Sequence, residues 1–244
     1  MDRIQLAQMI DHTLLKPEAT DADVIALCAE AAELGTYSVC VSPTFVSLAA
    51  ANVSNGVKVA TVCGFPSGKH EAEIKAAEAK LSVSQGAHEV DMVIDVGRAI
   101  MGDWDYLEAE VSAVRKATSG ALLKVILETG ELGTLEQIRK ASDIAMNAGA
   151  DFIKTSTGKI QPAATMPVTL TMLEAIRDYY YKTGKMVGMK AAGGISKSKL
   201  ALHYLVMVKE TLGEAWLDKK WFRFGASSLA NDVLMQVAKE EEGT

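Results

Sequence analysis

Cysteine is scarce in this sequence, with only Cys28, Cys40 and Cys63 among 244 residues. An odd number of widely spaced cysteines argues against a disulfide framework and is typical of a reducing cytoplasm, where we expect the protein to act. The sequence also lacks an apolar run of transmembrane length, and its first ten residues lack the basic region and apolar core of a signal peptide. We therefore expect no contact with a membrane.

Positive charge and metal-binding patterns are missing as well. The formal net charge is -6 and no dense basic run occurs, which argues against nucleic acid as the main partner. The four histidines are scattered, without an H-E-x-x-H motif or paired C-x-x-C motifs, so the sequence predicts no metal site. No G-x-G-x-x-G motif follows the early strands, which weakens the case for a dinucleotide, and we expect no cofactor.

What the sequence does contain is a regular alternation of short apolar runs and amphipathic stretches. We expect a short helix over residues 3–10 and then eight strands, at residues 11–15, 38–41, 57–63, 89–94, 122–127, 152–154, 186–191 and 221–224. The expected helices between and after them lie at residues 21–34, 45–52, 70–85, 103–118, 135–145, 167–181, 196–212 and 227–238.

Such alternation predicts parallel strands joined by crossover helices. Eight units in a chain near the roughly 250 residues of a typical (β/α)8 barrel favour a closed barrel over an open sheet. The predicted fold is a single α/β domain of residues 1–244, a TIM barrel with a short N-terminal helix.

Three segments, residues 35–40, 86–91 and 149–154, share one frame in which a glycine leads into a strand. The sixth position of each is Cys40, Asp91 or Lys154. On equivalent barrel units this offset puts the three side chains at a similar depth near the carboxyl ends of their strands, where barrel active sites lie. Junctions in which a helix ends at a glycine before a strand occur throughout such folds, and this alone could explain the shared glycines. It does not explain why charged residues lie within apolar strands.

Lys154 closes an apolar strand and is the candidate nucleophile. Burial disfavours the ammonium form, lowers the pKa of the amine and so makes it nucleophilic. Lys190 falls on the same face of the next strand, where a second cation would lower the pKa of Lys154 further, and Asp91 supplies compensating charge. These three are the predicted catalytic residues, and Asp11 is a fourth ionisable residue in a strand. Two simpler interpretations stay open: a structural ion cluster, and a lysine that only contacts phosphate.

Three loops that follow successive predicted strands are rich in glycine and hydroxyl groups, namely residues 155–159, 191–196 and 225–228. Loops of this kind suit phosphate, which barrels often bind after strands seven and eight. The candidate contacts to substrate and phosphate in these loops are Thr157, Gly158, Lys159, Gly193, Gly194, Ser227 and Ser228.

At these residues the chain resembles the deoxyribose-phosphate aldolase family, over nearly its whole length. The segments at 11–13, 39–41, 89–91, 152–159, 190–194 and 223–228 fit that family's pattern in order. The segment around Lys154 and residues 225–228 are the most specific. The resemblance implies a class I aldolase that reversibly cleaves 2-deoxy-D-ribose 5-phosphate to D-glyceraldehyde 3-phosphate and acetaldehyde.

The resemblance also implies roles for particular residues. Lys154 would form a Schiff base, while Asp91 and Lys190 would move protons through an ordered water. Asp11 would lie behind the site or at a substrate hydroxyl, with Cys40 nearby. The 5-phosphate would be held by Lys159, Gly193, Gly194, Ser227 and Ser228.

The family resemblance further implies a homodimer or a homotetramer. Many members of the family end in a tyrosine that reaches the site, whereas residues 239–244 of this chain contain none. Two alternatives stay open: another Schiff-base phosphosugar aldolase of transaldolase-like type, and a non-catalytic phosphosugar-binding barrel. The joint presence of Lys154, Lys190 and Asp91 argues against the second.

Overall fold

The sheet of this protein closes on itself. In the computed structural model, which describes residues 3–230, 232 and 233, eight parallel strands pair in chain order and β1 also pairs with β8. The strands are β1 (Ile10–Leu14), β2 (Ser38–Val41), β3 (Lys58–Cys63), β4 (Glu89–Val93), β5 (Leu122–Ile126), β6 (Phe152–Lys154), β7 (Gly188–Ala192) and β8 (Phe222–Ala226). The predicted (β/α)8 barrel is confirmed.

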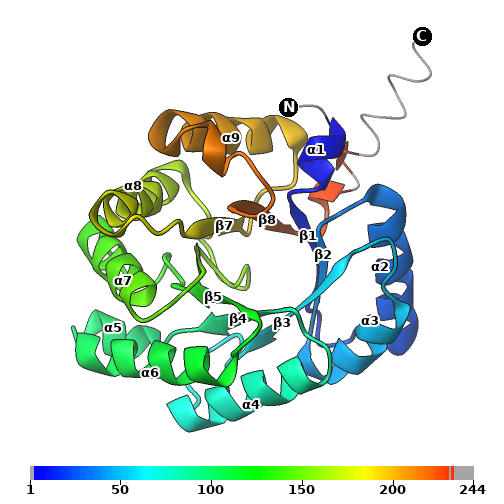
Figure 1. Cartoon of the computed structure of the whole chain (residues 1–244), viewed down its shortest axis with the longest axis horizontal. Helices are drawn as coiled ribbons and strands as arrows, with labels where there is room; N and C mark the ends of the chain where they lie inside the picture. Colours follow the sequence, from blue (N-terminus) through cyan, green and yellow to red (C-terminus); the bar gives the residue numbers. More distant parts are fainter. Residues whose placement is uncertain (1–2, 231, 234–244) are drawn as a thin grey trace.

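Helices surround the barrel, as Figure 1 shows in a view along its axis. They are α1 (Arg3–Ala7), α2 (Asp21–Leu34), η1 (Pro43–Phe45), α3 (Val46–Asn52), α4 (Ala72–Ser84), α5 (Val96–Ile100), α6 (Trp104–Ala117), α7 (Leu135–Asn147), α8 (Met166–Thr183), α9 (Ser198–Leu212) and η2 (Glu214–Trp216). The predicted short N-terminal helix is α1. No helix within the described ranges is long and apolar enough to cross a membrane.

Local sequence signals account for where these helices begin and end. Thr20 caps α2, because its side chain accepts a hydrogen bond from the Asp23 N–H while the Asp23 carboxylate accepts one from the Thr20 N–H. Gly35 ends the same helix at a φ of 66°, a left-handed conformation that glycine adopts without steric cost. Thr134 caps α7 by accepting a hydrogen bond from the Gln137 N–H.

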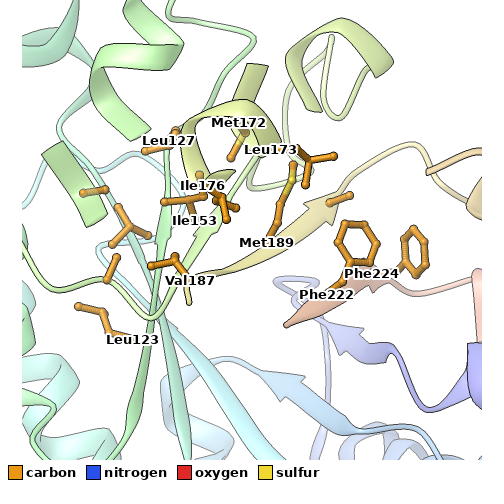
Figure 2. Close-up of a cluster of buried hydrophobic side chains, with 14 of the residues drawn as sticks. Leu123, Leu127, Ile153, Met172, Leu173, Ile176, Val187, Met189, Phe222 and Phe224 are labelled. Atoms are coloured by element: carbon orange, nitrogen blue, oxygen red, sulfur yellow. The ribbon is translucent and has the colours of Figure 1, made fainter. Parts of the chain in front are cut away.

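The main hydrophobic core lies between the outer face of the barrel and the helices. Figure 2 shows part of it, where Ile153 of β6, Met189 of β7 and Val187, just before β7, meet Met172 and Ile176 from α8. Side chains alternate along each strand, so Ile153 packs outward while Phe152 and Lys154 point into the barrel. Strands buried on both faces are expected in a parallel sheet that is covered by helices.

Several element boundaries differ from the prediction. Helix α1 ends at Ala7, because Ile10 already pairs with Phe224 of β8. Strand β7 runs from Gly188 to Ala192 and β8 from Phe222 to Ala226, each reaching beyond its predicted end. Helix α5 was not predicted. It is a five-residue helix, and the Asp95 carboxylate caps it by accepting a hydrogen bond from the Arg98 N–H.

The predicted helix over residues 227–238 lies largely outside the described residues. Leu229, Ala230, Asp232 and Val233 are helical. Residues 240–244, whose three consecutive glutamates predict a solvated tail, lie wholly outside the described residues.

Candidate active site

Four of the ionisable residues predicted for the site meet inside the barrel. Lys154 of β6 and Lys190 of β7 are register partners, so their side chains lie side by side on the inner face. Asp91 of β4 reaches both, since its Oδ2 lies 2.8 Å from Lys154 Nζ and 2.9 Å from Lys190 Nζ. Asp11 of β1 lies behind Lys190, with Oδ2 2.6 Å from the Lys190 Nζ. The predicted proximity of the two lysines and Asp91 is therefore present in the structure.

These contacts give the two lysines opposite tendencies to lose a proton. Burial lowers the pKa of Lys154, and the charge of Lys190 lowers it further, so the attraction of Asp91 does not restore the ordinary value. Burial acts on Lys190 too, but Asp11 and Asp91 together raise the pKa of Lys190 above its usual range. Lys154 is therefore the lysine that more readily becomes a neutral amine.

Asp91 is held in the ionised state by its surroundings. Burial alone would raise its pKa, but Lys124, Lys154 and Lys190 hold the pKa of Asp91 well below its usual range. Cys40 of β2 is fully buried and faces the same charges, and burial raises the pKa of its thiol. Cys40 thus lies beside these charges in its neutral form, and its place near the active site stays a prediction.

A cavity of about 760 Å³ lies over the carboxyl ends of β1, β6, β7 and β8 and reaches Lys154. Lys154 is 3% exposed, whereas Asp11, Asp91, Lys190 and Cys40 are completely buried beneath it. A small molecule in this cavity therefore meets the Lys154 amine first, with the other charges behind it.

The three predicted loops line this same cavity, which brings together Thr157, Gly158, Lys159, Gly193, Gly194, Ser227 and Ser228. Gly193 has a φ of 86°, and a Cβ atom there would lie 2.5 Å from the Ala163 Cβ and 3.2 Å from the Gly158 Cα. Only glycine lets these backbones approach so closely. The exposed Ser227 and Ser228 stand at the end of β8, directly before a helical turn.

Two of these loop residues are already engaged. The Thr157 N–H and hydroxyl both donate to the Glu128 carboxylate, at 3.1 and 2.5 Å. The Lys159 ammonium donates to the Leu15 carbonyl oxygen at 2.9 Å. Thr157 and Lys159 as direct phosphate contacts therefore stay predictions.

The sequence matches the family described as DeoC/LacD family aldolase over residues 5–233. The chain belongs to the DeoC/LacD aldolase family. A deoxyribose-phosphate aldolase from Mycolicibacterium paratuberculosis is 51% identical, across 83% of this chain and 89% of that protein. The Homo sapiens protein of the same name is 41% identical, across 96% of this chain and 80% of that protein.

Solved structures agree with this family. The one described as a unique tetrameric structure of deoxyribose phosphate aldolase from Aeropyrum pernix has a TM-score of 0.77 to this chain, at 30% identity. The match covers 98% of this chain and 93% of that chain.

Sequence reasoning missed three charged residues inside the barrel of this DeoC/LacD aldolase: Lys124, Glu89 and Arg223. Lys124 Nζ lies 2.7 Å from Asp91 Oδ1 and 2.6 Å from Glu89 Oε2. Arg223 lies 2.9 Å from Asp11 and 3.0 Å from Glu89. Lys124 and Arg223 are each the single charged residue of an apolar strand, and Glu89 shares β4 with Asp91. A charge within an apolar strand is the same signal that marked Asp91. Glu128, which holds the loop of Thr157, was also missed.

Proposed function

We propose that this DeoC/LacD aldolase reversibly cleaves 2-deoxy-D-ribose 5-phosphate to D-glyceraldehyde 3-phosphate and acetaldehyde through a Schiff base on Lys154. One observation carries the proposal. A buried lysine whose pKa is lowered is open to a cavity that the three glycine- and hydroxyl-rich loops also line. The relatives named deoxyribose-phosphate aldolase support the substrate and the reaction.

The chemistry follows from the charge state of the site. The neutral amine of Lys154 adds to the C1 aldehyde, and loss of water gives a protonated imine. The C2–C3 bond then breaks as the C3 hydroxyl gives up its proton, and the electron pair moves into the imine to form an enamine. Protonation of C2 and hydrolysis of the imine release acetaldehyde and return the free amine.

Asp91 and Lys190 exchange the protons in this proposal. Asp91 is ionised, since its pKa is lowered, and so is the group that accepts a proton. Lys190 stays an ammonium ion, since its pKa is raised, and so provides positive charge and a donor. Asp11 holds Lys190 from behind. Gly158, Gly193, Gly194, Ser227, Ser228 and, after release from their present partners, Thr157 and Lys159 bind the substrate and its phosphate.

Borohydride trapping tests the proposal. Reduction in the presence of deoxyribose 5-phosphate, followed by peptide mass mapping, should attach the sugar-derived adduct to Lys154. The exposed Lys182 of α8, which does not line the cavity, is the internal control for non-specific labelling. An adduct on Lys190 would reverse the two roles, and an absence of any adduct would reject the Schiff base.

Another Schiff-base phosphosugar aldolase is the alternative, and a product assay separates the two. Acetaldehyde as the donor in the synthetic direction supports the proposed reaction, whereas a requirement for a ketone donor contradicts it.

The working form of the protein is a single-domain homodimer or homotetramer in the cytoplasm. The family match over residues 5–233 supports one domain, and the tetramer from Aeropyrum pernix supports self-association. The three cysteines are free and buried, which suits a reducing compartment. Light scattering on the purified protein tests the association, and a monomer at all concentrations would contradict it.

A further inference from the structure

Six charged side chains inside the barrel form a closed ring of alternating sign. Asp91 contacts Lys190 at 2.9 Å, Lys190 contacts Asp11 at 2.6 Å, and Asp11 contacts Arg223 at 2.9 Å. The ring returns through Glu89, which lies 3.0 Å from Arg223 and 2.6 Å from Lys124. Lys124 closes it at 2.7 Å from Asp91. We call these six residues the ion ring.

The ion ring contains three carboxylates and three cations, so it is neutral when all six are ionised. Lys154 joins it from outside, through an ion pair with Asp91 at 2.8 Å, which is the one ion pair found for Lys154 among the described residues. A protonated Lys154 would therefore be an odd cation beside a balanced ring. Asp91 attracts that charge, but Lys190 repels it and burial opposes it.

Glu89 and Arg223 form the part of the ring furthest from the substrate. Glu89 precedes Asp91 by two residues on β4, so it lies one layer closer to the amino ends of the strands. The Arg223 guanidinium lies 3.4 Å from the centre of the Tyr37 ring and donates to the Lys219 carbonyl. Arg223 and Tyr37 line a separate cavity of about 410 Å³, together with Asp151 and Trp221.

We propose that Glu89 and Arg223 are positioning residues that set the charge balance around Lys154 from the opposite end of the barrel. Neither reaches the substrate cavity, and both act through their ring neighbours Lys124 and Asp11. The inference rests on the proposed Schiff base at Lys154. The proposal predicts two pH shifts of opposite sign. Loss of the Glu89 carboxylate makes the net charge of the ring more positive, and loss of the Arg223 guanidinium makes it more negative.

The charged and titratable groups that form the ion ring or lie beside it, apart from Lys154 itself, come from nearly every strand of the barrel. They are Asp11 from β1, Cys40 from β2, Glu89 and Asp91 from β4, Lys124 from β5, Lys190 from β7 and Arg223 from β8, with Tyr37 just before β2. Of these, Glu89 and Arg223 can be changed without removing a direct contact of Lys154, which makes them suitable for a test.

The test is the pH dependence of kcat/KM for deoxyribose 5-phosphate, whose acidic limb reports the free enzyme's essential base. Glu89→Gln leaves the ring with excess positive charge, so the acidic limb should move to lower pH by about one unit. Arg223→Met leaves excess negative charge, so the limb should move to higher pH by about one unit. The double variant restores neutrality, and its limb should return toward that of the unmodified protein.

Controls separate this role from a purely structural one. Arg223→Lys keeps the charge and should keep the limb in place, even if kcat falls. Arg98→Met removes an exposed arginine that pairs with Asp103 and with no member of the ring, and it should leave the limb in place. Equal shifts of one sign in both single variants, or unmoved limbs with lower kcat, would overturn the proposal. If Arg223→Met does not fold, the acidic limb of Glu89→Gln is compared with the limbs of the double variant and of Arg223→Lys. A limb at lower pH in Glu89→Gln than in both still supports the proposal.

A second measurement keeps this result separate from the proposed function. The rate at which acetic anhydride labels Lys154 is followed against pH by peptide mapping, without substrate, and it reports the pKa of the amine directly. Shifts of opposite sign in this rate support the ring even if the protein cleaves another sugar. Failure of borohydride trapping in the unmodified protein rejects the proposed function alone.

Discussion

Two groups of buried charges lie on opposite sides of the barrel wall, and only the inner group lines either of the two cavities described above. Outside the barrel, Lys75 of α4 pairs with Glu110 of α6 and donates to the Val93 carbonyl oxygen at 2.9 Å. The Glu110 carboxylate also accepts a hydrogen bond from the Asp95 N–H at 3.0 Å. One cation faces one anion, and both have backbone partners.

Inside the barrel the numbers differ, because four cations face three carboxylates. Burial of charge is common to both groups, so burial alone does not mark a catalytic residue. The excess of one cation does, since one lysine must give up its proton or remain uncompensated. The structure leaves that excess on Lys154, the one lysine of the group that reaches the cavity.

Replacement of Lys154, the cation in excess, should give the largest effect on activity. Lys154→Met should lower kcat by about 10⁴-fold or more, since it removes the proposed nucleophile. The free energy of unfolding should stay unchanged or rise by about 1 kcal/mol, because Asp91 keeps Lys124 and Lys190 as partners. Steady-state kinetics and urea unfolding measure the two. A loss of several kcal/mol in stability would show that Lys154 is a structural lysine like Lys75.

The matched substitution outside the barrel should do the reverse. Lys75→Met leaves the Glu110 carboxylate buried without its cation, which should lower the free energy of unfolding by about 3–5 kcal/mol. Turnover per folded molecule should not change, because Lys75 is separated from the cavity by the barrel wall. Lys75→Met with Glu110→Gln removes both charges and should recover much of the stability. A fall in kcat of the folded variant would remove the distinction between the two groups.

The sequence predicted the barrel because its signals are local. Periodic apolar runs, caps such as Thr20 and glycines such as Gly35 specify each element, and eight units then fit one closed sheet. The pairing of Lys154 with Lys190 was predictable for a similar reason, since period-two alternation on two neighbouring strands puts both on the inner face. The short helix at Val96–Ile100 was missed because five residues are too few for a periodic pattern to appear.

The ion ring was not predictable in the same way. Glu89 and Lys124 are visible as charges within apolar strands, but their meaning depends on which partners the closed barrel brings to them. Arg223 reaches Asp11 only because β8 pairs with β1, at the two ends of the chain. The charge balance inside the barrel depends on seven residues on six strands, so no local sequence pattern predicts it.

A negative charge added at the opening of the substrate cavity tests whether the loop after β8 binds phosphate. Ser228→Asp puts a carboxylate on the loop where the substrate phosphate is proposed to bind, so the KM for deoxyribose 5-phosphate should rise by about a hundredfold. Unphosphorylated deoxyribose should be affected little, and Ser228→Asn is the uncharged control of similar size. Equal losses for both sugars would mean that the phosphate binds elsewhere.

Asp232 pairs a buried carboxylate with an exposed cation, unlike the two groups above. Its replacement should have the smallest effect on the free energy of unfolding. Its carboxylate is buried, but its cationic partner Lys197, at 3.0 Å, has a side chain that is 68% exposed. The same carboxylate accepts hydrogen bonds from the Ser198 N–H and hydroxyl, each at 2.8 Å, at the first turn of α9. These hydrogen bonds, with that from Lys197, lower the pKa of Asp232 to about 2.

The lowered pKa fixes the sign of a pH effect on stability. A carboxyl group with a folded-state pKa below its unfolded value of 3.8 stabilises the fold above that value and loses the contribution as pH falls toward 2. Asp232→Asn should therefore lower the free energy of unfolding by about 1 kcal/mol at pH 7, as loss of a helix cap does. The difference from the unmodified protein should shrink as the pH of urea unfolding is lowered from 5 to 3. Asp143→Asn, on the surface of α7, should show less than half this effect. A difference that is the same at every pH would mean that Asp232 acts through its shape and hydrogen bonds rather than through its ionisation.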